Sequence, residues 1–210
     1  MTEASRKDRI LGVAERLFSH YGPAKTTVAD IARACGIGVG SVYLDFSSKE
    51  AILAALSRKN VRALASRMHA AAPEGPAPRR IVAMLEARVV ALFELAEGGQ
   101  HGCDLVRCRA SRGSASPATE ERAAPVSPFQ PNLGLEVRTL LEDEIRRGVE
   151  LGELGAVDIH RTVDLLELAF AALSPPAVFQ LKRDDAVEKA RSLAVLVVFG
   201  LRSGAAADER

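Results

Sequence analysis

The chain has 210 residues, of which 48% are hydrophobic and 26% are charged, and its formal net charge at pH 7 is +1. This length and composition suffice for one large or two smaller packed domains and exclude disordered and collagen-like proteins. No run approaches the ~20 apolar residues of a membrane span, and the N-terminal MTEASRKDRI has no apolar signal core. Three cysteines do not make a disulfide framework. We therefore expect a cytoplasmic protein without a membrane segment.

The first predicted helix covers residues 6–21. Its apolar residues recur at helical spacing and form one face: Ile10, Val13, Ala14, Leu17 and Phe18. Gly22 and Pro23 predict its end, because glycine suits a helix terminus and proline prevents a restart. The basic residues at its start either reach a phosphate of a bound nucleic acid or form an ordinary solvated helix start.

Residues 26–50, TTVADIARACGIGVGSVYLDFSSKE, predict two short helices and the start of a third. Thr27 is the expected N-cap of the first, with Asp30 over the positive end of the same helix. Gly36 ends that helix, because glycine accommodates the positive φ of a sharp turn. A second helix, residues 39–44, follows so closely that the two must cross steeply, as in a helix-turn-helix.

The next predicted helix, residues 48–70, begins with a capping box made by Ser47 and Glu50. Lys49 lies in its first turn, where the helix dipole disfavours a cation. A phosphate of an external ligand would explain this lysine, because it would accept hydrogen bonds from the ammonium and from the free N–H groups. An ordinary surface lysine is the alternative.

The stretch from Ile10 to Leu56, with ILGVAERLFSHYG, TTVADIA, GSVYLDF and SSKEAIL, resembles the N-terminal DNA-binding domain of the TetR family of one-component transcriptional regulators. The resemblance implies an all-α chain with a three-helix helix-turn-helix DNA-binding domain at residues 1–50. It also implies a connecting helix at residues 48–71 and a C-terminal helical ligand-binding and dimerisation domain at residues 72–210. Double-stranded DNA with a palindromic operator is the expected partner.

The expected DNA-binding residues are Lys25, Thr27, Val39, Gly40, Ser41, Tyr43 and Lys49. The second helix of the pair has no Arg, Asn or Gln, so it lacks the bidentate contacts that best distinguish bases. We expect Val39 to reach a thymine methyl, Gly40 to let the helix approach closely and Ser41 to bond a base edge or phosphate. The resemblance implies a backbone contact for Tyr43. Specificity then rests partly on DNA shape and half-site spacing.

Two residues of this region depart from the family, and two others should face inward. Gly38 stands where the family often has a capping Ser or Thr, and Asp45 stands where it often has His or Tyr. A carboxylate facing phosphate would be repelled, so we expect Asp45 to turn away or to pair with a basic residue. Val42 and Phe46 are expected in the core.

The remaining chain predicts four longer helices, at residues 79–97, 133–151, 158–173 and from Asp185 onward, with a short helix at 103–112 and a loop at 113–131. Leu135, Leu140, Leu141 and Ile145 are expected inside the second of these, and Glu144 outside. Asp158 is a predicted N-cap, and Asp185 and Glu188 are predicted to cap the last helix.

The last helix contains SLAVLVVFGL, which is apolar on nearly all sides and therefore requires burial on two of them. A homodimer through the last two helices, as the resemblance implies, would provide the second side. Ala190, Ala194 and Gly200 are small enough for a partner helix to come close. A fully intramolecular core is the alternative.

The resemblance implies a small-molecule effector bound among the C-terminal helices. The predicted lining is Met84, Arg88, Phe93, Val137, Leu140, Leu165 and Phe170, although each also suits an ordinary core. Apolar residues dominate this set, so an apolar or aromatic effector is preferred. Arg88 or Glu144 becomes informative only if it is buried without a partner.

His101, Cys103, Asp104 and Cys108 lie close together in the sequence and suggest a thiol- or metal-responsive regulator using Cys103 and Cys108 as an alternative. Small buried thiols are the simpler interpretation, and we expect no metal site and no cofactor. No catalytic motif is present, so an enzyme is not expected. The sequence therefore predicts a DNA-binding transcriptional regulator, a ligand-released homodimeric repressor.

Overall fold

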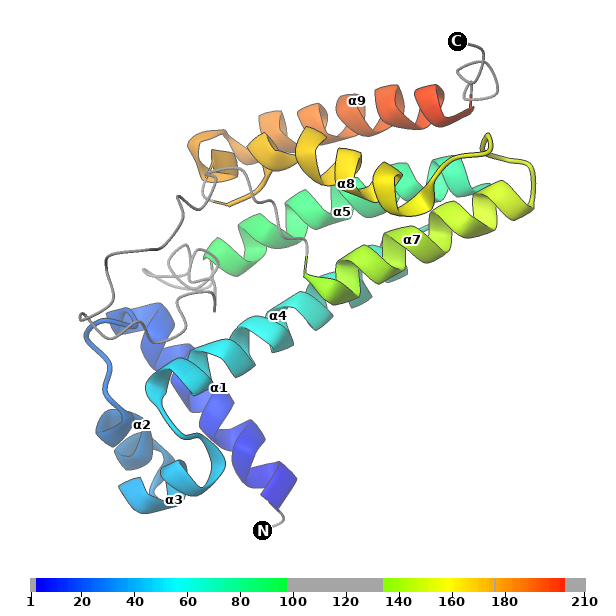
Figure 1. The fold of residues 1–210 in the computed structure, drawn as a ribbon. Helices are drawn as coiled ribbons and strands as arrows, with labels where there is room; N and C mark the ends of the chain where they lie inside the picture. Colours follow the sequence, from blue (N-terminus) through cyan, green and yellow to red (C-terminus); the bar gives the residue numbers. More distant parts are fainter. Residues whose placement is uncertain (1–2, 98–133, 176, 203–210) are drawn as a thin grey trace, which may run out of the picture. The chain divides into compact units, whose positions relative to one another are not determined.

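A computed structural model describes residues 3–97, 134–175 and 177–202, and all regular secondary structure within these ranges is helical (Figure 1). The helices are α1 (Glu3–Tyr21), α2 (Val28–Cys35), α3 (Val39–Asp45), α4 (Lys49–Ala71), α5 (Ala77–Glu97), α7 (Leu135–Glu150), α8 (Ile159–Ala169), the 3-10 turns η1 (Ala171–Leu173) and η2 (Ala177–Gln180), and α9 (Arg183–Arg202). The predicted all-α class is confirmed. None of the helices in the described ranges combines the length and apolarity needed to traverse a bilayer.

The chain forms two compact units. Among the described residues, the first comprises 3–60 and 94–97, and the second comprises 61–93, 134–175 and 177–202. The chain passes from one unit to the other within α4, after Asn60, and again within α5, after Phe93. The domain limits expected from the sequence, residues 1–50 and 72–210 with a connecting helix at 48–71, stay a prediction.

The first unit contains a small apolar core made by α1, α2, α3 and the start of α4. Its buried members are Ile10, Val13, Ala14, Phe18, Ile31, Ala32, Cys35, Val42, Ile52 and Leu56, with Phe46 partly buried against them. The predicted inward positions of Val42 and Phe46 are therefore confirmed. The core fixes which side of α3 remains outside.

Local signals set the ends of α2 as expected. The hydroxyl of Thr27 accepts a hydrogen bond from the Asp30 amide at 3.2 Å, and the Asp30 carboxylate accepts one from the Thr27 amide at 3.0 Å. Gly36 follows the helix with φ +65°, a left-handed conformation that favours glycine. The predicted cap and helix end are both confirmed.

The predicted capping box at the start of α4 is wrong by one residue. Ser48 is the N-cap, because its Oγ accepts a hydrogen bond from the Ala51 amide at 3.1 Å. Ser47 therefore precedes the helix, and Glu50 lies in the first turn without being the third helical residue. Two adjacent serines leave this register undetermined in the sequence. An acid in the first turn is favourable with either register.

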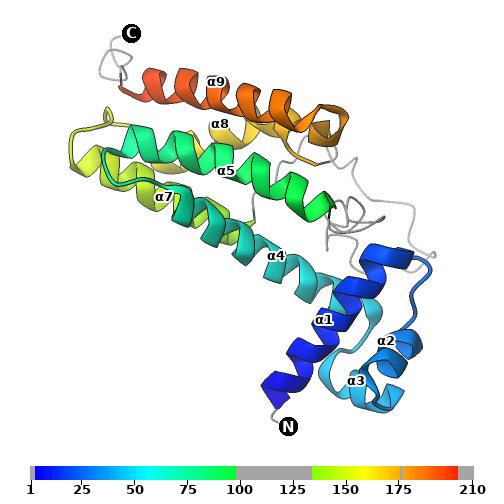
Figure 2. The ribbon, with the colours of Figure 1, turned by 180° about the vertical axis from the view of Figure 1, so that it is seen from behind.

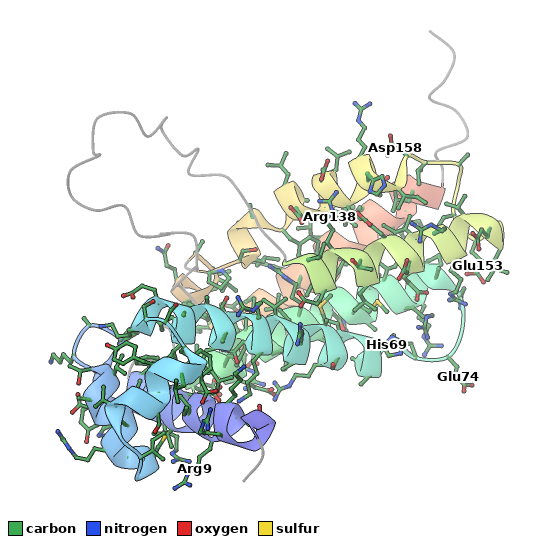
Figure 3. All side chains as sticks on the ribbon, turned by 60° about the horizontal axis from the view of Figure 1, so that its bottom comes forward. Arg9, His69, Glu74, Arg138, Glu153 and Asp158 are labelled. Carbon is green, nitrogen blue, oxygen red and sulfur yellow. The ribbon has the colours of Figure 1, made fainter. Side chains whose placement is uncertain are left out.

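The second unit packs α5, α7, α8 and α9 beside one another. In both Figure 1 and Figure 2, α5 runs lengthwise between α9 and α7. Ion pairs join the neighbouring helices: Arg191 with Glu86, Arg80 with Glu144 at 2.8 Å, and Arg138 with Asp164 at 2.7 Å. Figure 3 shows Arg138 among the side chains between α7 and α8.

Carboxylates cap two helices of this unit. Glu153 accepts a hydrogen bond from the Ala77 amide at 2.6 Å, which places an acid at the positive end of α5. Asp158 accepts one from the Arg161 amide at 3.0 Å and is the predicted N-cap of α8 (Figure 3). Directly before Glu153, Gly152 takes φ +69° at the end of α7. The turn from α7 to α8 therefore follows its sequence signals.

Two inside–outside assignments on α7 are wrong. Leu135 is exposed, because it lies two positions and thus about 200° from buried Val137. Glu144 is only 6% exposed, since it shares a face with Val137 and Leu141. Its charge is tolerated there because the side chains of Arg80 and Arg147 both donate to it.

The C-terminal helices also differ from expectation. The helix predicted to reach residue 173 ends at Ala169 and continues as the turn η1. The last helix begins at Arg183, so Asp185 lies in its first turn and not at the cap. Ala190 and Ala194 are fully buried within this chain and are not available to a partner helix. The predicted elements at 103–112 and 113–131 lie outside the described residues.

Candidate nucleic-acid interface

The outer side of α3 is an uncharged surface. Val42 is fully buried, and Gly40 and Leu44 each lie two positions from it, about 200° around the helix. Leu44 is 78% exposed, and Val39 and Tyr43 are also exposed. We call Val39, Gly40, Tyr43 and Leu44 the α3 outer face. It offers methyl groups, one phenol and bare backbone to a partner.

Nothing within the described residues requires a glycine at position 38 or at position 40. A Cβ added to Gly38 or Gly40 would meet no atom within 4 Å, and neither residue has a positive φ. Glycine inside a helix costs up to about 1 kcal/mol relative to alanine. A partner that approaches the backbone closely is a physical reason for accepting that cost.

Asp45, the last residue of α3, forms a two-point ion pair with Arg6. Arg6 Nε donates to Oδ2 at 2.5 Å and Nη2 donates to Oδ1 at 3.0 Å. The hydrogen bonds from Arg6 lower the pKa of the Asp45 carboxyl below its usual value. The expected pairing of Asp45 with a basic residue is confirmed. Arg6 is consequently engaged within the unit, which the sequence did not indicate.

Lys49 makes a contact that the sequence did not predict. Its Nζ donates a hydrogen bond to the Pro23 carbonyl at 2.8 Å, which joins the start of α4 to the turn after α1. This bond explains a lysine in the first turn of a helix without any external anion. An ammonium has three donors, so a phosphate contact by Lys49 is compatible with the bond and stays a prediction.

Three further predicted DNA-binding residues remain: Lys25 and Thr27 lie just before α2, and Ser41 lies on α3. Thr27 is exposed, but its hydroxyl already accepts from the Asp30 amide and donates to the Asp30 carboxylate at 2.6 Å. Lys25 is exposed and lines, with Tyr21 and Arg33 among others, a hollow of about 430 Å³. Ser41 is half-buried on α3. Of the seven predicted residues, the structure places Val39, Gly40 and Tyr43 on one face, while Thr27 has a clear structural role.

Leu44 is the member of the α3 outer face that was not predicted. The signal was present, because an inward Val42 places both residues two positions away on the outside. The helical period therefore places Leu44 outside, as it does Gly40, which was selected for its small size. A leucine at this position suits contact with thymine methyl groups or sugar carbons.

The predicted effector residues do not all come together. Met84, Arg88, Val137 and Phe170 are buried, Phe93 and Leu140 are partly buried, and Leu165 is exposed on α8. The ring of Phe93 packs edge-on against Phe179, with centroids 5.7 Å apart. These positions are compatible with an ordinary core, and their role in ligand binding stays a prediction.

The cysteine cluster suggested as a redox or metal sensor, with His101 and Asp104, lies outside the described residues. Within the described ranges, no group of His, Cys, Asp and Glu side chains is arranged to hold a metal ion. Cys35 is buried in the core of the first unit, and burial raises the pKa of its thiol. A raised pKa makes this thiol less reactive.

Comparison with known proteins shows a likeness concentrated in the N-terminal segment of the chain. The family described as "Bacterial regulatory proteins, tetR family" matches residues 10–56. The uncharacterized HTH-type transcriptional regulator YerO of Bacillus subtilis is 50% identical over 48 residues, which cover 23% of this chain and 17% of YerO. The HTH-type transcriptional repressor KstR2 of Mycolicibacterium smegmatis is 49% identical over 47 residues, 22% of this chain and 23% of KstR2. The matches span less than a quarter of these relatives' own lengths.

Solved structures extend the likeness to the whole fold. A TetR/AcrR-family regulator of Thermobifida fusca has a TM-score of 0.61 and 26% identity, covering 91% of this chain and 97% of that one. FadR of Bacillus subtilis, solved in complex with stearoyl-CoA, has a TM-score of 0.59 and 20% identity, with the same coverage. An N-terminal helix-turn-helix followed by a C-terminal helical domain, as predicted, is therefore confirmed as the fold class.

Proposed function

We propose that the N-terminal domain of this chain, which matches the tetR family over residues 10–56, binds DNA and that the protein is a transcriptional repressor. In this proposal it binds a palindromic operator as a homodimer and is released by a small effector. The regulatory relatives support the proposal only for the N-terminal segment that they share with this chain. The dimer, the effector and the operator contacts are inferred from the residues below.

The α3 outer face is the observation that carries DNA binding. It combines exposed apolar side chains with a glycine that has no packing neighbour within 4 Å of an added Cβ. A surface that faces only water gains nothing from exposed apolar side chains beside bare backbone, whereas a helix that lies in a major groove can contact DNA through both. The face has no charged side chain, so affinity depends mainly on contacts with the DNA backbone and selectivity partly on DNA shape.

Exposed apolar side chains on the last two helices support a homodimer. On α8, Leu165 and Leu168 are exposed, and on α9 Leu196 and Phe199 are 70% and 61% exposed. Large apolar residues gathered on adjacent helices indicate a surface that a partner covers. A second copy of the chain satisfies this and also supplies the two-fold symmetry that a palindromic operator requires. Gly200, which is exposed near Phe199, permits close approach.

Release by an effector is supported by the fold. The structural neighbour FadR holds stearoyl-CoA, so the same fold accommodates a ligand in at least one protein. In our proposal the effector changes the distance between the two DNA-binding domains of the dimer, which must stay about one helical turn, ~34 Å, apart on the operator. Effector and operator then weaken each other's binding by the same factor.

Fluorescence anisotropy with DNA from the region flanking the protein's own gene tests the DNA-binding part. We expect affinity that falls steeply with salt, as counterion release requires. Tyr43→Ala should weaken binding by about tenfold or more, since it removes a large side chain from the interface. Leu151→Ala, at an exposed site of the second unit, is the matched control and should leave affinity unchanged. DNA affinity that does not depend on salt, or that survives Tyr43→Ala intact, would refute the assignment.

A further inference from the structure

Arg88 on α5 is a buried cation whose charge has no ion-pair partner among the described residues. It is 5% exposed, and its Nε is buried without any hydrogen-bond partner. Nη2 donates to the Ser174 hydroxyl at 2.8 Å, and Nη1 donates to the Leu173 carbonyl at 3.4 Å. Both acceptors are neutral, so the contacts orient the guanidinium without neutralising it.

The segment that follows α8 holds these acceptors in place. Ser174 Oγ donates to the Phe170 carbonyl at 2.9 Å, which leaves its oxygen directed to Arg88 as an acceptor. Leu173 and Phe170 are themselves buried. On α5, Met84, Leu85 and Leu92 are buried on the turns around Arg88. The guanidinium therefore lies in apolar surroundings.

Two other charged side chains of the second unit that the structure describes, Glu144 and Arg138, have oppositely charged partners, unlike Arg88. Buried Glu144 accepts hydrogen bonds from Arg80 and Arg147. Arg138 has carboxylates on two helices, including Glu167 at 3.6 Å. Both Glu144 and Arg138 are thus neutralised by side chains of opposite charge. A buried charge without a hydrogen-bonded carboxylate is costly, and the charge of Glu167 offsets this cost only in part. An anion from outside the chain would supply the missing partner.

Burial lowers the pKa of Arg88 to about 10, while the charge of Glu167 acts in the opposite direction. The guanidinium consequently remains protonated at neutral pH. Its unpaired N–H points to the kind of group that is missing, since a planar guanidinium binds an oxyanion through two or more parallel hydrogen bonds.

We propose that Arg88 binds the oxyanion of the effector, and that the effector is a small amphipathic acid, a mainly apolar molecule carrying one carboxylate or similar group. This inference rests on the proposed effector-released regulator and specifies the chemistry of its ligand. The oxyanion accepts from Nε and from an Nη group, and the apolar part lies among the surrounding hydrophobic side chains.

The enclosure of Arg88 links binding to a change of shape. Its Nε is shielded on all sides, so an anion reaches it only when α5 and the segment at residues 170–174 separate. The ligand then favours a conformation that the ligand-free chain rarely adopts. Differential affinity for two conformations is what an effector needs to shift an equilibrium.

Ligand binding to the full-length protein, measured without DNA by calorimetry and thermal shift, tests the inference. The probes are octanoate and phenylbutyrate, their matched alcohols, and octyl phosphate. We expect the wild type to bind the acids about tenfold or more tightly than the alcohols, because only the acids pair with a desolvated cation. Octyl phosphate distinguishes a carboxylate from a phosphate as the oxyanion. Acids and alcohols binding equally, or no probe binding, overturns the proposal.

Two matched variants on α5 complete the experiment. Arg88→Met should abolish the preference for acids, keep the affinity for alcohols and leave the ligand-free melting temperature unchanged or higher, since it removes an unpaired charge. Arg80→Met should lower the melting temperature, because buried Glu144 loses a partner, and should keep the preference. A preference that survives Arg88→Met, or a melting temperature that falls as far as in Arg80→Met, overturns the proposal.

Operator release is measured separately, so the two proposals can fail independently. If the protein binds no DNA, the proposed function fails, whereas the acid preference and its loss in Arg88→Met still stand. If operator is bound and is released equally well from the wild type and from Arg88→Met by the same compound, the proposed function stands and the role of Arg88 is refuted.

Discussion

Gly40→Ala separates the stability of the DNA-binding domain from its affinity for DNA. Gly40 lies on the outer side of α3, directly opposite buried Val42. The added methyl group would meet no atom within 4 Å, and the backbone of Gly40 has no positive φ that alanine would strain. The substitution therefore introduces no clash within the described residues.

The expected change in stability follows from helix propensity alone. Alanine is favoured over glycine in a helix by up to about 1 kcal/mol, so the free energy of unfolding should rise by that amount or somewhat less. The first turn of the seven-residue α3 contains Gly40, which favours the lower part of the range. Urea denaturation followed by circular dichroism measures the shift as a later unfolding midpoint with an unchanged slope.

The expected change in DNA binding has the opposite sign. A methyl group forced into a close-packed interface typically costs about 1–3 kcal/mol, which corresponds to a five- to 150-fold weaker complex. Fluorescence anisotropy on operator DNA at fixed salt measures it, and Gly12→Ala is the matched control. Gly12 also has no neighbour within 4 Å of an added Cβ but lies on α1.

A single result would refute this reasoning. If Gly40→Ala stabilises the domain and leaves operator affinity unchanged, the backbone at Gly40 is not approached closely by DNA. The α3 outer face would then have to bind in another orientation, or DNA would have to bind elsewhere. Equal losses of affinity in Gly40→Ala and Gly12→Ala would point instead to a general effect on the domain.

The remaining predictions use the same binding and unfolding assays. Lys49→Ala should weaken operator and random DNA alike, lower the salt slope by about one and reduce stability by up to about 1 kcal/mol through its lost backbone bond; a loss confined to the operator would contradict it. Arg6→Ala should destabilise the domain by about 1–3 kcal/mol, because it leaves the buried carboxylate of Asp45 unpaired, and an unchanged midpoint would count against this. Since Arg6 lowers the pKa of Asp45, the pair's contribution should be complete above the ordinary carboxyl pKa of ~4 and disappear as pH falls through the lowered folded-state value, so Asp45→Asn should flatten the acid side of the stability profile. Phe199→Glu should turn the proposed dimer into a monomer in sedimentation velocity, whereas Leu135→Glu at an even more exposed site on α7 should not; two unaffected dimers would exclude the α9 surface.

Short-range signals in the sequence predicted the first unit well. Thr27, Asp30 and Gly36 act on neighbouring backbone groups, so their roles follow from spacing alone. The inward position of Val42 also followed from the helical period. The error at Ser47 arose where two adjacent serines offered alternative caps, a choice that packing of the following helix decides.

Contacts between distant segments were beyond such reasoning. The bond from Lys49 to the Pro23 carbonyl and the pairing of Arg6 with Asp45 join residues that are 26 and 39 positions apart. Likewise, Glu144 is buried although it is polar, because Arg80, 64 positions away on α5, donates to it in addition to its neighbour Arg147. The sequence pattern predicts which face of a helix is buried. Partners that are distant in the sequence decide whether a charged side chain can be buried on that face.

The pairing of Arg6 with Asp45 has a practical consequence for handling the protein. Removing the first six residues would take away Arg6 and leave the carboxylate of Asp45, the last residue of α3, without its hydrogen-bonded partner. A polyanion would be repelled by it. If a preparation that lacks Arg6 fails to bind DNA, the missing arginine therefore explains the failure before any property of the operator does.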